Sequence, residues 1–109
     1  MGLFGNLFGG GGMSAQEAKA EMDSGNAYVL LDVREPGEFN SGHIPGAKLM
    51  PLSTVASAAP KEIKDQGMRI LVYCKAGGRA GQAVDILKQL GYTNAVNIGG
   101  IDSWPYEIV

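Results

Sequence analysis

The stretch Tyr73-Cys74-Lys75-Ala76-Gly77-Gly78-Arg79 decides how the rest of this sequence is interpreted. It follows Ile70-Leu71-Val72-Tyr73, an apolar run of strand-forming residues, and it precedes residues 80–90, whose apolar positions recur at helical spacing. The sequence therefore predicts a strand, a tight glycine-rich loop and a helix in succession. Ligands of open parallel sheets bind beyond the carboxyl ends of the strands, so this loop is the candidate functional site.

Cys74 is the only cysteine in the chain and stands at the first position of this loop. A loop that leads into a helix directs successive backbone N–H groups toward one point, and the helix end adds partial positive charge. Gly77 and Gly78 permit the dihedral angles that such a cradle needs, while Lys75 and Arg79 add two cations. This environment favours the thiolate and could hold a small oxyanion above the sulfur. The alternative is an inert, buried cysteine at a strand end.

The composition limits the class of protein. A chain of 109 residues that is 45% hydrophobic and 18% charged suits one globular domain with a core of its own. Its net charge of −2 argues against a nucleic-acid partner, because phosphate binding needs a basic surface. A single cysteine excludes an internal disulfide, a C-x-x-C redox pair and a cysteine-cluster metal site.

The expected compartment is the cytoplasm, because a reactive lone thiol fits a reducing environment. No apolar run approaches the ~20 residues of a membrane span, and the N-terminus lacks the features of a secretory signal. Residues 1–12 are expected to be a flexible tail rich in glycine and phenylalanine, since four consecutive glycines end it. Residues 13–109 are expected to form the domain. The tail contains the pairs Leu3-Phe4 and Leu7-Phe8, so a weak membrane anchor or partner anchor is an alternative role for it.

Strand and helix signals alternate along the domain. Ser14 and Glu17 form a capping box at the start of a helix that ends before Gly25. The other elements are expected as a strand at Tyr28–Val33, a turn at Pro36-Gly37, a short strand at Lys48–Met50, a helix from Ser53 or Thr54 through Ala59, a further turn from Pro60 to Ile63, a strand at Ala95–Ile98, a tight turn at Gly99-Gly100 and a short helix carrying Trp104. Alternation of this kind predicts a parallel sheet covered on both faces.

Charged residues follow the first predicted strand. Asp32, Arg34 and Glu38 are interpreted as a structural ion-pair cluster, because arginine forms fixed forks with carboxylates that hold loops in place. The alternative is a catalytic carboxylate. His43, the only histidine, is interpreted as a structural loop residue, and its alternative role is that of general base for Cys74.

Several motifs together resemble a single-domain rhodanese over roughly residues 14 to 104. They are Leu31-Asp32-Val33-Arg34-Glu35, Glu38-Phe39, Gly42-His43-Ile44-Pro45-Gly46-Ala47, Val72-Tyr73-Cys74 with Gly77 and Arg79, Gly99-Gly100 and Trp104, in the order found in that family. The resemblance implies an α/β fold with a small parallel sheet of four or five strands and helices on both faces. The family usually has a strand before the first helix, and here residues 9–13 hold four glycines and a methionine, so we expect that edge strand to be missing or vestigial.

The resemblance also implies a chemistry. In that family the loop cysteine, here Cys74, accepts a sulfane sulfur as a persulfide and passes it to a nucleophile. The substrate would be held by Lys75, Ala76, Gly77, Gly78 and Arg79, and the arginine that matches Arg34 is mainly structural. The expected partners are a small sulfane-sulfur donor such as thiosulfate and a thiol or protein acceptor. No metal or organic cofactor is implied, and we expect a monomer.

Two other functions remain open at this point. The first is a phosphatase or arsenate reductase that uses the same kind of loop, although the related phosphatases carry one more residue between cysteine and arginine than the four here. The tighter cradle suits sulfur better than a phosphate. The second is a non-catalytic binding module, against which the presence of Cys74 weighs.

Overall fold

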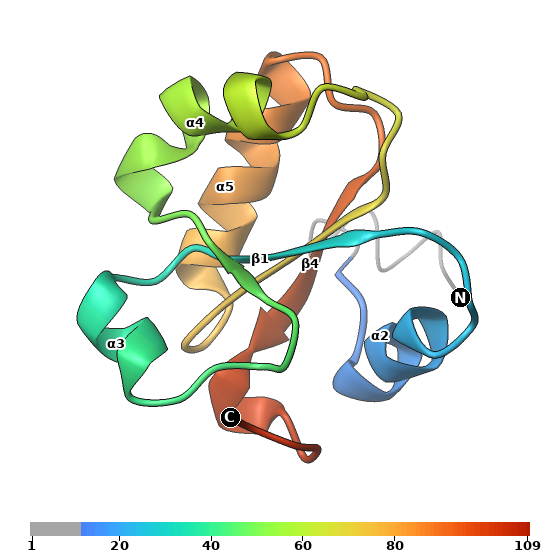
Figure 1. Ribbon diagram of the computed structural model, residues 1–109, viewed down its shortest axis with the longest axis vertical. Helices are drawn as coiled ribbons and strands as arrows, with labels where there is room; N and C mark the ends of the chain where they lie inside the picture. Colours follow the sequence, from blue (N-terminus) through green and yellow to red (C-terminus); the bar gives the residue numbers. More distant parts are fainter. Residues whose placement is uncertain (1–11) are drawn as a thin grey trace.

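The computed structural model describes residues 12–109, which form a parallel sheet of four strands with helices on both faces (Figure 1). The strand order is β2-β1-β3-β4, and each strand is parallel to its neighbours. The strands are β1 (Val29–Asp32), β2 (Lys48–Leu49), β3 (Ile70–Cys74) and β4 (Ala95–Gly100). The expected α/β class with a small parallel sheet is therefore confirmed, and among the described residues the sheet has four strands rather than five.

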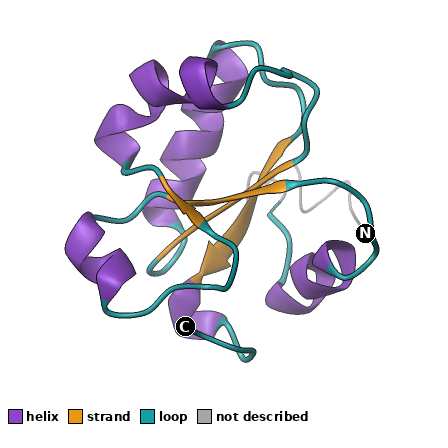
Figure 2. Ribbon diagram, in the orientation of Figure 1, coloured by secondary structure: helices purple, strands orange, loops and turns teal. Residues whose placement is uncertain are grey.

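Helices connect the strands and surround the sheet (Figure 2). They are α2 (Ala15–Met22), α3 (Pro36–Asn40), α4 (Val55–Glu62) and α5 (Gly78–Gln89), with single 3₁₀ turns η1 (Leu52–Thr54) and η2 (Ile101–Ser103). The predicted capping box of Ser14 and Glu17 is confirmed at the start of α2. Gly25 and Gly91 follow α2 and α5 with φ angles of +91° and +100°, as expected of left-handed helix stops.

The prediction for the segment before β3 was wrong in two details. Thr54 is the N-cap residue of α4, as predicted, but its side chain makes no capping bond, because its hydroxyl donates to the Pro51 carbonyl. Pro60 lies inside α4 and does not begin a separate turn. Buried Val55 and Ala59 hold this helix against the core, which offsets the cost of the exposed proline inside it.

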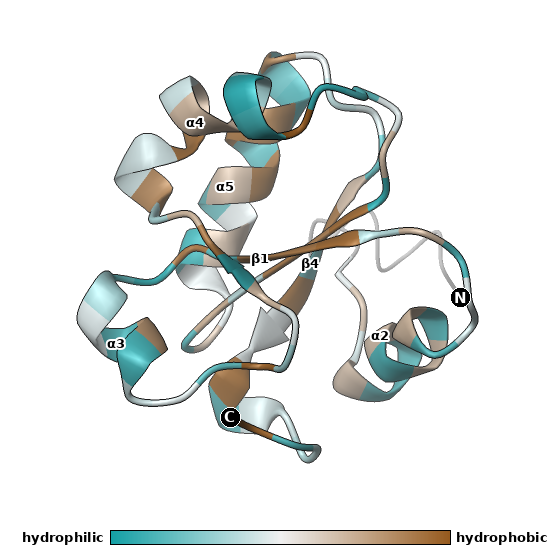
Figure 3. Ribbon diagram, in the orientation of Figure 1, coloured by the Kyte–Doolittle hydropathy of each residue, from teal (hydrophilic) through white to brown (hydrophobic). Residues whose placement is uncertain are grey.

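Alternate residues of the central strands enter two separate cores. Leu31 and Val72 belong to the core beneath α4 and α5, and Leu30 and Leu71 belong to the core beneath α2 and η2. The strands accordingly carry hydrophobic residues along their length. Figure 3 shows β1 mostly brown, the colour of hydrophobic residues, where it crosses the molecule. Burial on both faces explains the near-continuous apolar runs that predicted β1 and β3.

The free edge of β4 bears on the expected loss of an edge strand. No strand precedes α2 within residues 12–109, and a single backbone bond, from the Met13 N–H to the Asn97 carbonyl at 2.9 Å, reaches this edge. The expected edge strand is thus reduced to one contact in the described part of the chain. The expected tail lies outside the described residues except for Gly12. None of the helices in residues 12–109 is long and apolar enough to cross a bilayer.

Candidate functional site

Cys74 is the last residue of β3 and is only 1% exposed. Its side chain faces the core beneath α5. The sulfur accepts hydrogen bonds from the Gly77 N–H at 3.0 Å and the Ala80 N–H at 3.4 Å. The end of β4 and the helix α3 lie at the same end of the molecule as the start of α5 (Figure 1). The candidate site is therefore a thiol whose sulfur accepts hydrogen bonds from one loop amide and one helix amide.

Further amides of the loop are available beside this sulfur. Gly77 is the residue before α5, with a φ of +109° that favours glycine. Gly78 and Arg79 are the first two residues of α5, where N–H groups have no partner within the helix. In residues 12–109 neither these two N–H groups nor that of Ala76 donates to another residue. Unpaired donors at a helix start form a site for negative charge, which suits a thiolate, a persulfide or a small oxyanion.

A bulge at the end of β4 supports one side of the loop. The pairing of β3 with β4 changes register between Val72 and Cys74, so that Cys74 lies opposite Gly100. A Cβ atom at Gly100 would overlap the Lys75 carbonyl, so the loop and the strand approach closely enough to require glycine there. The Lys75 carbonyl also accepts the Asp102 N–H at 3.1 Å. Gly99 and Gly100, predicted as a tight turn after the strand, are instead the last two residues of β4.

Asn97 in β4 is a contact of the loop that the sequence analysis missed. Its side-chain amide nitrogen donates to the Gly77 carbonyl at 3.0 Å, and its side-chain oxygen accepts the Gly99 N–H at 2.8 Å. The second contact is a local turn typical of an asparagine two residues before a glycine, so an Asn-x-Gly signal was present in the sequence. The first contact joins residues 20 apart and has no local signal.

Both cations of the loop are paired with carboxylates. The Arg79 guanidinium makes two bonds to Glu38 of α3, at 2.8 and 3.0 Å, and the Lys75 ammonium lies 2.8 Å from Asp102. The bonds from Arg79, assisted by the Glu35 N–H, lower the pKa of Glu38 from 4.5 to about 2. The structure thus brings Glu38 to Arg79 rather than to Asp32 and Arg34, and the predicted cluster of three divides into two pairs. Because each cation is paired with a carboxylate, the side chains around the loop carry little net positive charge.

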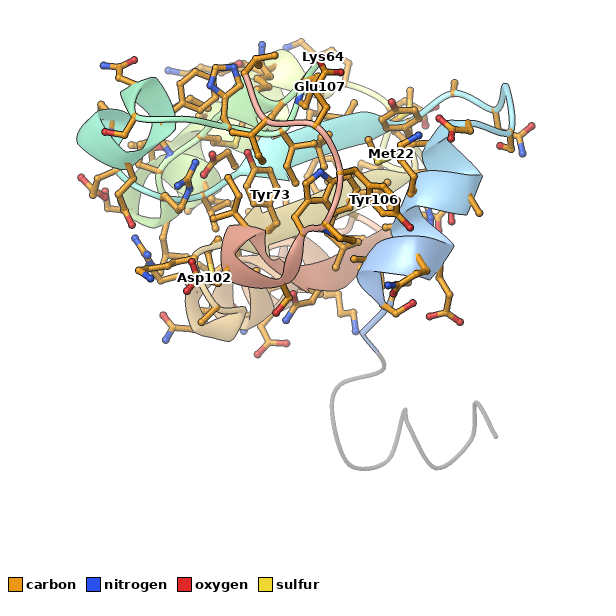
Figure 4. The ribbon with its side chains drawn as sticks, turned by 90° about the horizontal axis from the view of Figure 1, so that it is seen from below. Met22, Lys64, Tyr73, Asp102, Tyr106 and Glu107 are labelled. Carbon is orange, nitrogen blue, oxygen red and sulfur yellow. The ribbon has the colours of Figure 1, made fainter. Side chains whose placement is uncertain are left out.

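The remaining charges of the predicted cluster form a buried network at the end of β1. Asp32 is fully buried and binds Arg34 through the backbone N–H and the guanidinium, with its shortest bond at 2.7 Å from Nη2. The Tyr73 hydroxyl, in the molecular interior (Figure 4), donates to Asp32 at 2.7 Å and accepts the Ile44 N–H. Burial raises the pKa of Tyr73, and the bond to Asp32 raises the pKa of Arg34. Arg34 also donates to the Gly42 carbonyl, so this network holds the loop before β2 in place.

His43 is occupied by contacts within its own loop. Its Nδ1 donates to the Phe39 carbonyl at 3.0 Å, and its ring stacks on the Phe39 ring with centroids 3.7 Å apart. Its backbone pairs with that of Val109 near the C-terminus. No hydrogen bond joins it to Cys74, so the geometry favours the loop role over the role of general base.

Comparison with known proteins agrees with this geometry. The family model described as "Rhodanese-like domain" matches residues 14–106. A protein of Escherichia coli strain K12 named "Thiosulfate sulfurtransferase PspE" is 38% identical over 71 residues, which cover 65% of this chain and 68% of PspE. A protein of Allochromatium vinosum named "Sulfurtransferase" is 35% identical over 77 residues, 70% of each chain.

Solved structures and a longer relative extend the comparison. A structure titled "rhodanese with anions from E. coli" superposes with a TM-score of 0.72 at 35% identity, covering 76% of this chain and 98% of that one. The crystal structure of the Alr3790 protein from Anabaena sp. reaches a TM-score of 0.81 at 28% identity, covering 88% and 80%. The "Probable adenylyltransferase/sulfurtransferase MoeZ" of Mycobacterium tuberculosis is 35% identical over 100 residues, but the chain spans only 26% of its length. On the family match and these relatives, the chain belongs to the rhodanese-like domain family.

Proposed function

We propose that this protein is a rhodanese-type sulfurtransferase that carries sulfane sulfur on Cys74. The observation that carries the proposal is the set of amides around the sulfur: two already donate to it, and those of Ala76, Gly78 and Arg79 have no acceptor in residues 12–109. Relatives named as sulfurtransferases, among them PspE, support the reaction class. The proposed donor is a small sulfane compound such as thiosulfate, and the acceptor is a thiol or a protein.

The first half-reaction forms one sulfur–sulfur bond and breaks another. The Cys74 thiolate attacks the outer sulfur of thiosulfate, and sulfite leaves with the electron pair of the broken bond. Cys74 then carries a persulfide whose negative charge lies on the outer sulfur. Backbone donors fixed before the reaction stabilise that charge without reorganising, as an oxyanion hole does.

The second half-reaction restores the thiol. A nucleophile, which is cyanide in an assay or a thiolate in a cell, attacks the outer sulfur, and the Cys74 thiolate leaves with its electron pair. Because Cys74 is almost completely buried, a donor or acceptor must bring its reacting atom close to the loop to reach the sulfur. Four residues separate Cys74 from Arg79, and this short loop favours a sulfur atom over a phosphoryl group.

Intact mass spectrometry after incubation with thiosulfate tests the proposal. Since Cys74 is the only thiol, we expect the mass of one sulfur atom to be added, and we expect cyanide or dithiothreitol to remove it. The Cys74→Ser variant should keep its fold yet neither gain mass nor turn over, because a hydroxyl is a much poorer nucleophile toward sulfur. Sulfur transfer by Cys74→Ser would refute the mechanism. Turnover of an aryl phosphate by the wild type would instead favour a phosphatase.

A further inference from the structure

The side chain of Asn97 connects two parts of the candidate site that are separate in the sequence. It projects from β4 toward the first turn of α5, where its nitrogen would lie 3.5 Å from a Cβ atom at Gly81. The nitrogen donates to Gly77 and the oxygen accepts from Gly99, so both ends of the amide are used. An uncharged group with both ends bonded acts by fixing geometry rather than by its electrostatic field.

The bond to Gly77 helps to fix the orientation of one peptide group. The Gly77 carbonyl and the Gly78 N–H belong to one peptide, and no peptide bond in residues 12–109 is cis. In a trans peptide these two groups point to opposite sides, so a carbonyl held by Asn97 directs the Gly78 N–H away from β4. That N–H is one of the donors without a partner beside Cys74.

This peptide joins the two glycines of the loop, and its carbonyl accepts the Gly81 N–H of α5 at 3.0 Å as well as the Asn97 side chain. Gly77 and Gly78 have no side chains, and glycine backbones have more accessible conformations than those of any other residue. Gly77 itself has a φ of +109° and donates its own N–H to the Cys74 sulfur. The Asn97 contact therefore adds a second donor to the Gly81 N–H in limiting the rotation that would carry both amides away from the sulfur.

The bond to Gly99 orders the other side of the loop. By accepting the Gly99 N–H, Asn97 forms a local turn within the bulge of β4, where Gly99 has a φ of +94°. The bulge places Gly100 against the Lys75 carbonyl. The Asn97 side chain thus contacts both the end of β4, which supports the start of the loop, and the Gly77–Gly78 peptide near the end of the loop.

We propose that Asn97 is a positioning residue for Cys74: it fixes the Gly77–Gly78 peptide and the β4 bulge, and so holds the loop amides in the geometry that receives negative charge on sulfur. Because the transfer reaction is itself a proposal, this role in the reaction rests on the function proposed above. The effect on the thiol can nevertheless be measured without any turnover.

The test compares Asn97→Leu, Asn97→Asp and a matched control, Asn94→Leu. Leucine has nearly the size of asparagine and makes neither bond, whereas aspartate can still accept the Gly99 N–H but cannot donate to Gly77. Asn94 immediately precedes β4, and its side chain accepts a bond from Arg69 rather than contacting the loop. Three quantities are measured: the pH profile of Cys74 alkylation by iodoacetamide, the rate of sulfur transfer from thiosulfate to cyanide, and the melting temperature.

We expect Asn97→Leu and Asn97→Asp to shift the alkylation profile to higher pH and to slow sulfur transfer about tenfold, which is less than the ~100-fold that misplacing a reacting group by about 1 Å can cost. Asn94→Leu should change neither quantity. A lower melting temperature with an unchanged profile and transfer rate in both Asn97 variants would overturn the proposal and leave Asn97 a structural residue. If Asn97→Leu does not fold, Asn97→Ala decides, because it removes both bonds without adding the negative charge of aspartate, which by itself opposes a nearby thiolate. If the Asn97 variants shift the alkylation profile but the wild type takes up no sulfur, the role of Asn97 is supported and the proposed function is refuted.

Discussion

Two neighbouring strand ends, those of β1 and β3, present acidic groups that are equally buried but surrounded differently. Asp32 is 0% exposed and Cys74 is 1% exposed. The Asp32 carboxylate is bonded by the Arg34 backbone, the Arg34 guanidinium and the Tyr73 hydroxyl. The Cys74 sulfur has two amide donors, and other amides of its loop have no acceptor in the described part of the chain.

The difference separates a group with a structural role from the group that we propose to be reactive. Around Asp32 the donors match the acceptors, so the network is closed and its value lies in holding the adjoining loop. Around Cys74 the donors outnumber the acceptors, and unpaired backbone donors favour binding of an additional anion. Burial alone therefore does not distinguish the two groups, whereas the balance of hydrogen-bond donors and acceptors does.

The largest effect on stability is expected at the closed network. Asp32→Asn leaves the Arg34 guanidinium, which is 5% exposed, without its charged partner. Breaking a buried ion pair by removing one member costs about 3 to 5 kcal/mol of unfolding free energy. Urea denaturation measures this loss.

Lys48→Ala, which removes an exposed ion pair with Glu62, is the control and should leave the urea midpoint almost unchanged. Equal losses in Asp32→Asn and Lys48→Ala would mean that the network at the end of β1 is not the structural element inferred here.

The next largest effect is expected on turnover, at the bond between α3 and α5. Glu38 and Arg79 face each other with two bonds, so the guanidinium is held by protein. If Arg79 acts by fixing the start of α5, Glu38→Gln and Arg79→Ala should both slow sulfur transfer by about tenfold. If Arg79 instead binds the donor directly, Glu38→Gln should free it, and only Arg79→Ala should impair kcat/KM. Steady-state kinetics with thiosulfate distinguish the two.

The same pair predicts a dependence of stability on pH. Arg79 depresses the pKa of Glu38 in the folded chain from 4.5 to about 2. A carboxyl with a depressed folded pKa contributes stability that is fully present above its ordinary pKa and is lost as the pH falls through the folded value. The difference in unfolding free energy between wild type and Glu38→Gln should therefore shrink from about pH 5 to about pH 2. A difference that stays constant over this range would contradict the assignment.

Most of the fold could be predicted from local patterns. The buried strands gave near-continuous apolar runs, and the capping box at Ser14 and the glycine stop at Gly91 marked helix ends. The predicted turn at Pro60 was wrong because the preference of proline against helix is weaker than the packing of Val55 and Ala59, and Pro60 lies inside α4. Local preferences determine an element only where tertiary packing does not oppose them.

The partners within the site could be predicted less well. The position of Cys74 and the glycine loop followed from adjacent residues, and the amides near the sulfur follow from that same segment. The pairing of Arg79 with Glu38 spans 41 residues, and that of Lys75 with Asp102 spans 27. Such contacts depend on how parallel strands bring their carboxyl ends together, and a single sequence contains no local signal for the choice of partner.

The smallest effect is expected at the pair of Lys75 and Asp102, which lies at the molecular surface with the Asp102 side chain labelled in Figure 4. The two side chains are 61% and 52% exposed, and exposed ion pairs contribute at most about 1 kcal/mol. Stability should therefore hardly change in Lys75→Ala or Asp102→Asn. The KM for thiosulfate, a dianion, should rise about two- to threefold in Lys75→Ala and fall by a similar factor in Asp102→Asn, because the second change frees the ammonium group beside the loop.

An uncharged sulfane donor should show neither shift in KM. Raising the salt concentration should erase both shifts for thiosulfate, since screening acts on exposed charges, whereas the amides around Cys74 should be affected little. Opposite shifts that disappear with salt would show that Lys75 and Asp102 adjust the attraction of donors, while the backbone of the loop holds the sulfur.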